Sequence, residues 1–331
     1  MIEVNDSMIK YIQIVFIQLA FITGLFAQPV PAQDENIPYL VTFGNKAETY
    51  WGDDDFCQVF FFLIPTEFED PVYIKVFDPD CGGEVDEING FFNTTTEFSI
   101  YGGATCWTED DARGTEPIGN YKSGNLLASK KFGVDPEYDE GWYVFGPFNP
   151  KEGEFSKDFQ GYVFKMITEG LDGDDGNLYQ YYLSTDADFN IPIEGGKAFT
   201  YEYTFRMWNS SENVSHIYPY VEEGTVSVRQ WNFDWDSDGG IHALSVVRIF
   251  KGNKVSAEDV WADSEFSINP AEIGKSLDFR FVKKQYPVVI NNNVVISVQN
   301  QFGEAMPFFN IPIGGVPKYQ PMITIEEEKE E

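Results

Sequence analysis

The feature that most constrains the fold is a succession of short apolar stretches, separated by turns rich in Gly, Pro and Asp. In the clearest stretch, 198–207, the residues on one face are Phe199, Tyr201, Tyr203, Phe205 and Met207. Because alternate residues of a strand share a face, this pattern predicts a half-buried strand that ends the first domain. The run at 56–64 is apolar except for Gln58, which is typical of a strand buried on both faces. Many such stretches at regular spacing predict an all-β sandwich fold.

The strand pattern falls into two parts, and we expect an all-β chain with two β-sandwich domains. The first, at 38–207, is predicted to be jelly-roll-like, and the second, at 214–316, immunoglobulin-like. The Cys-Trp-Cys core of immunoglobulin domains is absent from the second, so this comparison concerns architecture only. The sequence Phe-Asn-Ile-Pro-Ile occurs at 189–193 and again at 309–313. We interpret it as a repeated edge strand, because proline is confined to the edges of sheets.

The two ends of the chain differ in character from the domains. Residues 1–27 are predicted to form a signal peptide, in which Lys10 precedes the apolar run 11–26 and Ala27 lies at the cleavage site. The run is short and interrupted for a membrane span, although an uncleaved anchor is the alternative. Residues 317–331 are predicted to be an acidic tail. The mature protein is therefore expected to be exported, whether periplasmic, on the cell surface or extracellular, without membrane insertion.

The charge of the chain limits its partners. With 17% aromatic residues, the sequence is too apolar for a disordered chain. A net charge of −32 repels nucleic acids and anionic lipids, which excludes both as partners. The same charge suits divalent cations, because bound cations would neutralise part of it.

The three cysteines are Cys57, Cys81 and Cys106. An odd number in an exported chain allows one disulfide and one free thiol. Cys81 and Cys106 lie in loop-like sequence and are the expected pair, whereas Cys57 lies in an apolar run and is expected to be a buried thiol. With only two histidines and no C-x-x-C motif, a zinc site is not expected.

One acidic stretch has the spacing of a calcium loop. It begins at Asn232 with the sequence N-F-D-W-D-S-D-G-G, and its acids are Asp234, Asp236 and Asp238. These are positions 1, 3 and 5 of an EF-hand loop, and Gly239 supplies the turn at position 6. Position 12 is Ser245 instead of Glu, and the flanks have the pattern of strands. The stretch therefore predicts a calcium loop between β-strands, with a solvated acidic turn as the alternative.

Two further acidic, glycine-containing loops are candidate cation sites. The first loop, 78–87, contains Asp78, Asp80 and Asp86, and the second, 170–177, contains Asp172, Asp174 and Asp175. Antiparallel sandwiches can bring distant loops to one end, so the two loops could share one site. The alternative is two independent turns that are solvated.

The chain resembles exported surface proteins of Bacteroidota, neighbours of outer-membrane peptidoglycan-anchored proteins. The residues that carry the resemblance are Phe26-Ala27-Gln28, Phe77-Asp78-Pro79-Asp80 with Gly82-Gly83, Gly173 to Asn177, and Phe233-Asp234-Trp235-Asp236. The resemblance implies a location outside the cytoplasm. It implies no reaction and no catalytic residue.

The expected function is that of a calcium-stabilised, non-enzymatic surface protein that binds a cell-surface protein or glycan, or serves as structure. One alternative is a carbohydrate-binding module that stacks sugars on Trp51, Trp107 or Trp235. Another is a hydrolase with an unrecognised carboxylate pair. His216 and His242 lie in no catalytic pattern, and no phosphate-binding or nucleophile motif occurs.

Overall fold

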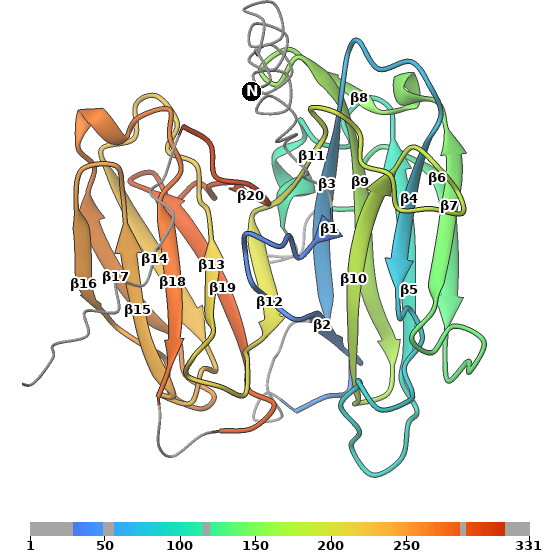
Figure 1. The fold of residues 1–331 in the computed structure, drawn as a ribbon, viewed down its shortest axis with the longest axis horizontal. Coiled ribbons are helices and arrows are strands. Elements are labelled where there is room, and N and C mark those ends of the chain that lie inside the picture. Colours follow the sequence, from blue (N-terminus) through green and yellow to red (C-terminus); the bar gives the residue numbers. More distant parts are fainter. Residues whose placement is uncertain (1–28, 49–55, 115–119, 285–288, 315–331) are drawn as a thin grey trace, which may run out of the picture. The chain divides into compact units, whose positions relative to one another are not determined.

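The structure is a computed structural model, and it describes residues 29–48, 56–114, 120–284 and 289–314. These residues form strands, turns and three short 3₁₀ turns, without any α-helix among them. The chain divides into two compact units (Figure 1). Within the described residues, the first unit comprises 29–33, 39–47 and 56–199, and the second comprises 34–38, 48 and 200–314. The all-β prediction is confirmed.

The first unit is a sandwich of two antiparallel sheets. Its strands are β1 (Pro29–Val30), β2 (Leu40–Phe43), β3 (Cys57–Pro65), β4 (Val72–Phe77), β5 (Thr95–Gly102), β6 (Asn125–Phe132), β7 (Trp142–Phe148), β8 (Glu154–Ser156), β9 (Gly161–Asp172), β10 (Gly176–Ser184) and β11 (Lys197–Thr200). One sheet has the order β2-β10-β4-β7, with β1 also on β10. The other has the order β11-β3-β9-β5-β6, with β8 also on β9.

This strand order is that of a jelly roll. Without the short strands β1, β8 and β11, the first unit has eight strands, which we number one to eight in chain order. Strands one, eight, three and six form one sheet, and strands two, seven, four and five form the other. Two interleaved Greek keys give this order, so the jelly-roll prediction for the first domain is confirmed.

Aromatic residues fill the space between the two sheets of the first unit. The β3 strand is buried at every position except its last, as its continuous apolar run predicts. The ring of Phe60 lies 4.7 Å from that of Tyr181, and Phe98 lies 5.4 Å from Tyr179, in edge-to-face contacts between the sheets. Burial of each such side chain stabilises the fold by about 1.5–3 kcal/mol.

The second unit has the same strand order. Its strands are β12 (Glu202–Arg206), β13 (Val214–Ile217), β14 (Ser227–Phe233), β15 (Gly239–Leu244), β16 (Ile249–Asn253), β17 (Ala262–Ser267), β18 (Asp278–Lys283), β19 (Asn293–Asn300) and β20 (Phe308–Phe309). The sheets are β12-β19-β14-β17 and β13-β18-β15-β16. The expected two-sheet sandwich is confirmed, and its strand order is that of a second jelly roll rather than that of an immunoglobulin domain.

The division between the units lies within the stretch with the clearest alternation. Lys197–Thr200 pairs with β3, whereas Glu202–Arg206 pairs with β19. The single strand predicted at 198–207 is thus two strands that belong to different sheets. Alternation identifies the buried face of each half but does not identify its partner strand.

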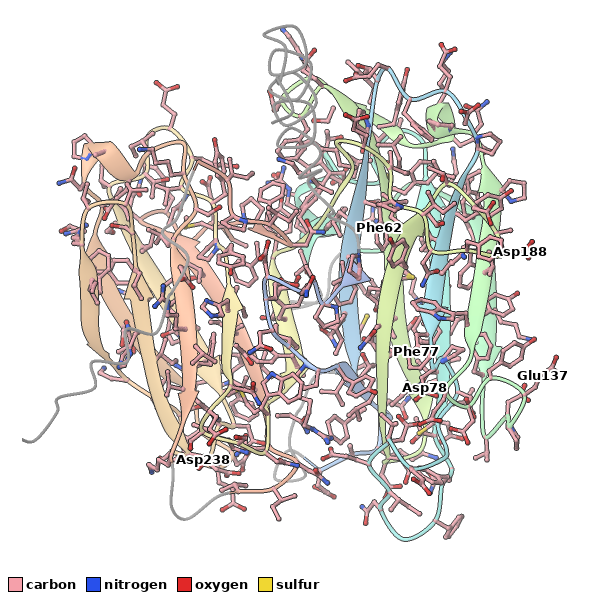
Figure 2. The ribbon with its side chains drawn as sticks, viewed as in Figure 1. Phe62, Phe77, Asp78, Glu137, Asp188 and Asp238 are labelled. Carbon is pink, nitrogen blue, oxygen red and sulfur yellow. The ribbon has the colours of Figure 1, made fainter. Side chains whose placement is uncertain are left out.

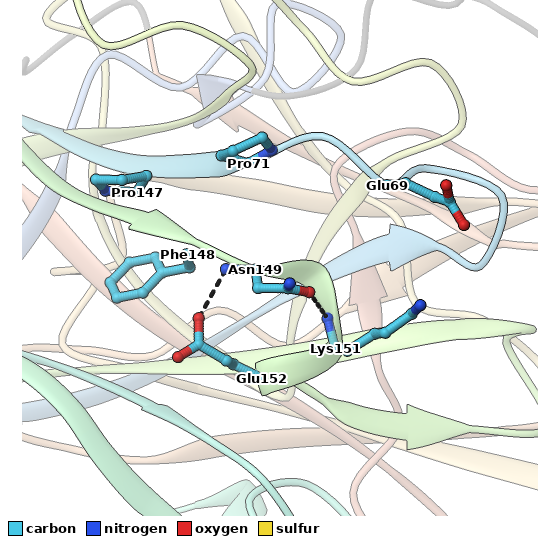
Figure 3. Close-up of a pocket in the computed structure, with 7 residues that line it drawn as sticks. All are labelled: Glu69, Pro71, Pro147, Phe148, Asn149, Lys151 and Glu152. Carbon is cyan, nitrogen blue, oxygen red and sulfur yellow. Dashed lines mark hydrogen bonds between the residues drawn. The ribbon is translucent and has the colours of Figure 1, made fainter.

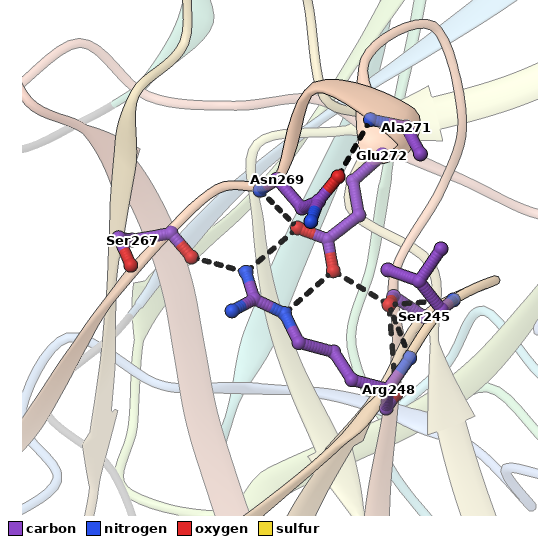
Figure 4. A network of polar contacts seen from close by, with 7 residues as sticks. Ser245, Arg248, Ser267, Asn269, Ala271 and Glu272 are labelled. Atoms are coloured by element: carbon purple, nitrogen blue, oxygen red, sulfur yellow. Dashed lines mark hydrogen bonds and ion pairs between the residues drawn. The ribbon is translucent and has the colours of Figure 1, made fainter.

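Two short sequences recur at equivalent places in the two jelly rolls. Asn149-Pro150-Lys151-Glu152 and Asn269-Pro270-Ala271-Glu272 each form a 3₁₀ turn between strands six and seven. In both, the Asn side chain accepts a backbone N–H and the Glu carboxylate accepts the N–H of the Asn, which is a capping box (Figures 3 and 4). The Phe-Asn-Ile-Pro-Ile sequences both follow strand eight. These matches indicate a duplicated jelly roll.

The prediction that Phe-Asn-Ile-Pro-Ile is an edge strand is wrong for most of its residues. No residue of 189–193 belongs to a strand, and only Phe309 of the second copy does. In the first copy this segment lies over β4, where the ammonium of Lys75 donates hydrogen bonds to Phe189 O and Asn190 Oδ1. The proline therefore belongs to a connection, where no ladder hydrogen bond is required of it.

The expected disulfide between Cys81 and Cys106 is absent. Cys57, Cys81 and Cys106 are all buried free thiols, as expected only for Cys57. Cys81 lies near the start of β5, where its N–H donates to Gly133 O, and Cys106 follows the end of β5. Eight strand residues at about 3.3 Å each hold the two cysteines roughly 25 Å apart, far beyond the span of a disulfide.

The predicted signal peptide and acidic tail lie outside the described residues. The described part of the chain contains no helical segment that could serve as a transmembrane span.

Candidate functional site

Acidic side chains gather where β4 ends in the first unit. Asp78 follows β4 directly, and its Oδ1 accepts a hydrogen bond of 2.9 Å from the N–H of Glu140. Asp80 Oδ2 accepts one of 3.0 Å from the N–H of Asp135. Both donors belong to the connection between β6 and β7, which also carries Glu137. Figure 2 shows Asp78 and Glu137 at the same end of this unit.

The second oxygen of each of these carboxylates has no partner. Asp78 and Asp80 are each 1% exposed, and Asp78 Oδ2 and Asp80 Oδ1 are buried without a hydrogen bond. Neither side chain forms an ion pair with any lysine or arginine of the described residues. A buried carboxylate without full compensation costs several kcal/mol. A proton or a cation bound at these carboxylates would reduce this free-energy cost.

The protonation equilibria follow from this burial. Burial and the nearby negative charges of Asp80, Asp139 and Glu140 together raise the pKa of Asp78 to about 7, although the hydrogen bond from the Glu140 N–H opposes the shift. Burial also raises the pKa of Asp80, to which Asp139 and Asp135 contribute. A bound cation would reverse both effects, because it favours the ionised carboxylates.

Asp86 has a different role in the same loop. Its Oδ2 accepts a hydrogen bond of 2.7 Å from the N–H of Gly82, and its Oδ1 accepts one of 2.7 Å from the N–H of Leu178. Burial nevertheless raises the pKa of Asp86 well above its ordinary value. Both oxygens are satisfied by the protein, so Asp86 ties the loop to β10.

The acids of the third loop also have protein partners. Asp175 is fully buried and accepts backbone N–H groups of Asn89, Asn93 and Thr94. Asp174 accepts the side-chain amides of Asn89 and Asn93. Asp172 is exposed and forms an ion pair with Lys46. These acids organise the segment 89–94 and leave few oxygens for a metal ion.

The structure brings the loops 78–87 and 170–177 next to each other, but not as the single shared site that was one of the two alternatives. Glu87 and Gly176 exchange two backbone hydrogen bonds of 2.9 Å, and the Asn177 amide donates to Pro79 O at 2.9 Å. Their carboxylates do not share one centre, because Asp174 and Asp175 face the segment 89–94. Within the part of the chain that the structure describes, no three acid, histidine or cysteine side chains are arranged to hold a metal ion.

In the second unit, the predicted calcium loop joins β14 to β15. Its strand flanks are confirmed, because β14 ends at Phe233 and β15 begins at Gly239. Asp234 Oδ1 accepts the N–H of Asp259 at 2.7 Å, and Asp236 Oδ2 accepts the side-chain amide of Asn292 at 2.9 Å.

Asp238, the third acid of this loop, lies beside a buried cation. Its Oδ2 lies 3.3 Å from the ammonium of Lys283, and both side chains are 1% exposed. Burial raises the pKa of Asp234 to about 7, and burial also raises the pKa of Asp236. Burial lowers the pKa of Lys283, although Asp238 opposes this shift. The loop thus already lies beside one positive charge, which comes from β18.

Sequence reasoning missed several members of these sites. The acidic turn with Asp135, Asp139 and Glu140 was detectable as the sequence D-P-E-Y-D-E. The Asp139 carboxylate lies against Gly83, where a Cβ atom would be 2.1 Å from Asp139 Oδ1, so a larger residue at 83 would require this carboxylate to move. The sequence does not predict that Lys283 belongs to the second site, because its pairing with Asp238 depends on the register of β15 and β18.

Two of the three tryptophans proposed for sugar stacking are buried. Trp235 is fully buried against Phe281, Trp107 is 7% exposed, and Trp51 lies outside the described residues. That prediction is wrong for Trp107 and Trp235, because both rings fill the interior. Trp142 is 37% exposed instead, and its ring lies 5.2 Å from that of Phe77.

The histidines have no catalytic arrangement. His216 Nδ1 lies 2.7 Å from Asp278 Oδ1, while the other Asp278 oxygen accepts a hydrogen bond of 2.7 Å from Arg280 Nε. Asp278 is thus shared between His216 on β13 and Arg280 on β18. His242 is exposed on β15.

An open pocket lies at the end of β7 (Figure 3). Its lining residues are Glu69, Pro71, Pro147, Phe148, Asn149, Lys151 and Glu152. Asn149 and Glu152 are engaged in the capping box, and neither Asp78 nor Asp80 contributes to it. The pocket does not have the converging polar groups of an active site.

Comparison with known proteins gives no further guide. No family model matches the chain, and no curated protein matches it.

Proposed function

We propose that the chain is an exported, non-enzymatic binding or structural protein whose first jelly roll is stabilised by calcium at Asp78 and Asp80. One observation carries the proposal. Asp78 Oδ2 and Asp80 Oδ1 are buried, near each other's charge, and without a hydrogen bond or ion pair. A cation that binds only the folded state would remove this cost and stabilise the unit.

Calcium suits this end of the sandwich better than softer metals do. Calcium prefers six to eight oxygen ligands in flexible geometry. Asp78, Asp80 and Asp139 supply carboxylate oxygens, which are ligands of this kind. The shell is not complete in the present side-chain arrangement. The exposed carboxylate of Asp139, whose charge acts on both Asp78 and Asp80, would add a third carboxylate, with backbone carbonyls and water supplying the other ligands.

Export and the class of partner rest on the sequence. The predicted signal peptide at 1–27 supports export, and the net charge of −32 argues against nucleic acids and anionic lipids. We therefore propose a cell-surface protein or a glycan as the partner.

Metal analysis and equilibrium dialysis of the purified chain test the calcium proposal. We expect one bound calcium that is lost in Asp78→Asn/Asp80→Asn. Glu137→Gln is the matched control, because this exposed acid belongs to the same end of the unit and its replacement changes the charge without removing a buried oxygen. Calcium binding that survives the double substitution, or that is absent from the wild type, would refute the site.

Carbohydrate binding is a second candidate function, favoured by one aromatic surface. On the outer face of the sheet β10-β4-β7, the exposed Trp142 lies 5.2 Å from Phe77 and 6.3 Å from Tyr182, measured between ring centroids. Aromatic rings on a flat sheet can stack against sugar rings. A glycan array should give a sugar-specific signal that Trp142→Ala abolishes and Trp261→Ala keeps. Equal signals from both variants, or none from the wild type, would count against this function.

A further inference from the structure

The acid sites of the two jelly rolls occupy the same place in the fold. In each unit, strand three ends in Phe-Asp-x-Asp: Phe77-Asp78-Pro79-Asp80 after β4 and Phe233-Asp234-Trp235-Asp236 after β14. The first aspartate of each has left-handed backbone geometry, with φ of +56° at Asp78 and +53° at Asp234. Such geometry is uncommon outside glycine, so its recurrence at one position is informative.

The surroundings of the two aspartates also correspond. The N–H donor to Asp78 is Glu140 and the donor to Asp234 is Asp259, each in the connection between strands five and six. Both donors have left-handed φ as well, +52° and +54°. Two residues after each donor is a tryptophan.

Each of these tryptophans packs on the phenylalanine that precedes the aspartate. The ring distance is 5.2 Å for Trp142 and Phe77 and 5.0 Å for Trp261 and Phe233. The capping boxes and the Phe-Asn-Ile-Pro-Ile sequences extend the correspondence to the rest of the unit. The two acid sites are therefore copies of one local structure.

The copies differ in their charges. The spacing of the motif places Asp238 of the second copy where the first copy has Gly82, so the second copy has one more acid, and the charge of Lys283 acts on both Asp238 and Asp236. No lysine or arginine of the described residues pairs with Asp78 or Asp80, whereas Lys283 extends from β18 to within 3.3 Å of Asp238 Oδ2. The ammonium also donates to Val289 O. Asp238 is 2% exposed, and neither of its oxygens accepts a hydrogen bond, so the ammonium is its main compensation.

We infer that the two jelly rolls carry copies of one cation site and that the ammonium of Lys283 takes the place of the divalent cation in the second copy. The inference rests in part on the proposed function, because it assigns calcium to the first copy. It follows that calcium can bind at Asp234, Asp236 and Asp238 only by displacing Lys283. The second jelly roll then keeps its loop folded without calcium.

Removal of the lysine charge tests this inference. In the full chain carrying Asp78→Asn/Asp80→Asn, equilibrium dialysis with calcium should find no bound ion, and the further change Lys283→Gln should add one ion per chain. Lys284→Gln is the matched control, since Lys284 is the exposed neighbour of Lys283 and should add none. A folded Lys283→Gln variant that binds no additional calcium would overturn the inference, whatever the first site does.

A companion variant covers loss of folding. If the Lys283→Gln chain does not fold without calcium but folds with it, the lysine acts as the cation and the inference stands. If it folds in neither condition, Lys283→Gln/Asp238→Asn decides, because this variant removes both charges of the pair. A folded, calcium-independent double variant would support charge compensation by Lys283, and a double variant that also fails to fold would contradict it.

Discussion

Two aspartates of the first unit show why burial alone does not define a ligand. Asp175 and Asp78 are both nearly inaccessible to solvent. Three backbone N–H groups donate to Asp175, while Asp78 receives one and keeps Oδ2 without a partner. The charge of Asp175 is therefore compensated by the protein's own hydrogen bonds, and the charge of Asp78 is compensated only in part.

Amide substitutions should separate these two roles. In chelator at pH 8, Asp175→Asn should lower the free energy of unfolding by about 1.5–3 kcal/mol, because hydrogen bonds to a charged group are lost. Asp78→Asn should cost little or even stabilise, since it removes a buried charge that has incomplete compensation. Urea unfolding measures both changes. A loss at Asp78→Asn as large as that at Asp175→Asn would contradict the assignment.

The raised pKa values of Asp78 and Asp234 predict a pH dependence in the absence of calcium. Both are raised from 3.8 to about 7, so the folded state binds these protons more tightly than the unfolded state does. Stability from these groups is then fully present below about pH 4 and is lost as pH rises to about 7. Unfolding free energies in chelator should fall between pH 5 and 8, and the fall should be smaller in Asp78→Asn/Asp234→Asn. An equal fall in both proteins would rule out this cause.

At the scale of elements, the 3₁₀ turn Pro270–Glu272 of the second unit is held by side-chain hydrogen bonds that its counterpart Pro150–Glu152 lacks. We call this set of hydrogen bonds the clamp. Glu272 is buried and receives two hydrogen bonds of 2.8 Å from Arg248 and one of 2.6 Å from Ser245 (Figure 4). Its counterpart Glu152 is exposed and satisfies only the capping box. The clamp joins the hairpin between β15 and β16 to the turn that precedes β18.

Arg248→Ala should therefore lower the free energy of unfolding by more than is usual for an arginine that is accessible to solvent. It leaves a buried carboxylate with fewer donors, and we expect a loss of about 1.5–3 kcal/mol in urea unfolding. Arg229→Ala removes an exposed ion pair of 2.8 Å with Glu265 and should cost no more than about 1 kcal/mol. Equal losses in the two variants would show that the clamp adds nothing beyond a surface pair.

The sequence pattern predicted most strands of this fold, because burial of one or both faces leaves a periodic trace, as in β3 and β12. It does not predict which sheet each strand joins, so it predicts one strand over 198–207 where the structure has two. Of the acid sites, Asp78, Asp80 and the loop from Asp234 to Asp238 were predicted. The acidic turn with Asp135 and Asp139 is visible in the sequence, but its position beside Asp78 and Asp80 is not. The pairing of Lys283 with Asp238 is not visible either, because only the tertiary fold brings these neighbouring strands and connections close.

At the scale of the whole molecule, duplication explains why two acid sites have the same geometry. Each jelly roll inherits the Phe-Asp-x-Asp end of strand three, and the two copies then compensate its charge differently. With a net charge of −32, any added salt also stabilises the chain by screening. A test of the calcium site must therefore distinguish binding from screening.

Thermal melting of the wild type and Asp78→Asn/Asp80→Asn, in calcium chloride and in sodium chloride of equal ionic strength, makes this distinction most directly. For a calcium dissociation constant on the order of 10⁻⁴ to 10⁻³ M, millimolar calcium should stabilise the wild type by roughly 0.4–1.4 kcal/mol. The Tm should then rise by roughly 1–5 °C above that in sodium chloride. The double variant should melt at the same temperature in both salts. A wild type that melts identically in calcium and sodium chloride would contradict the central claim.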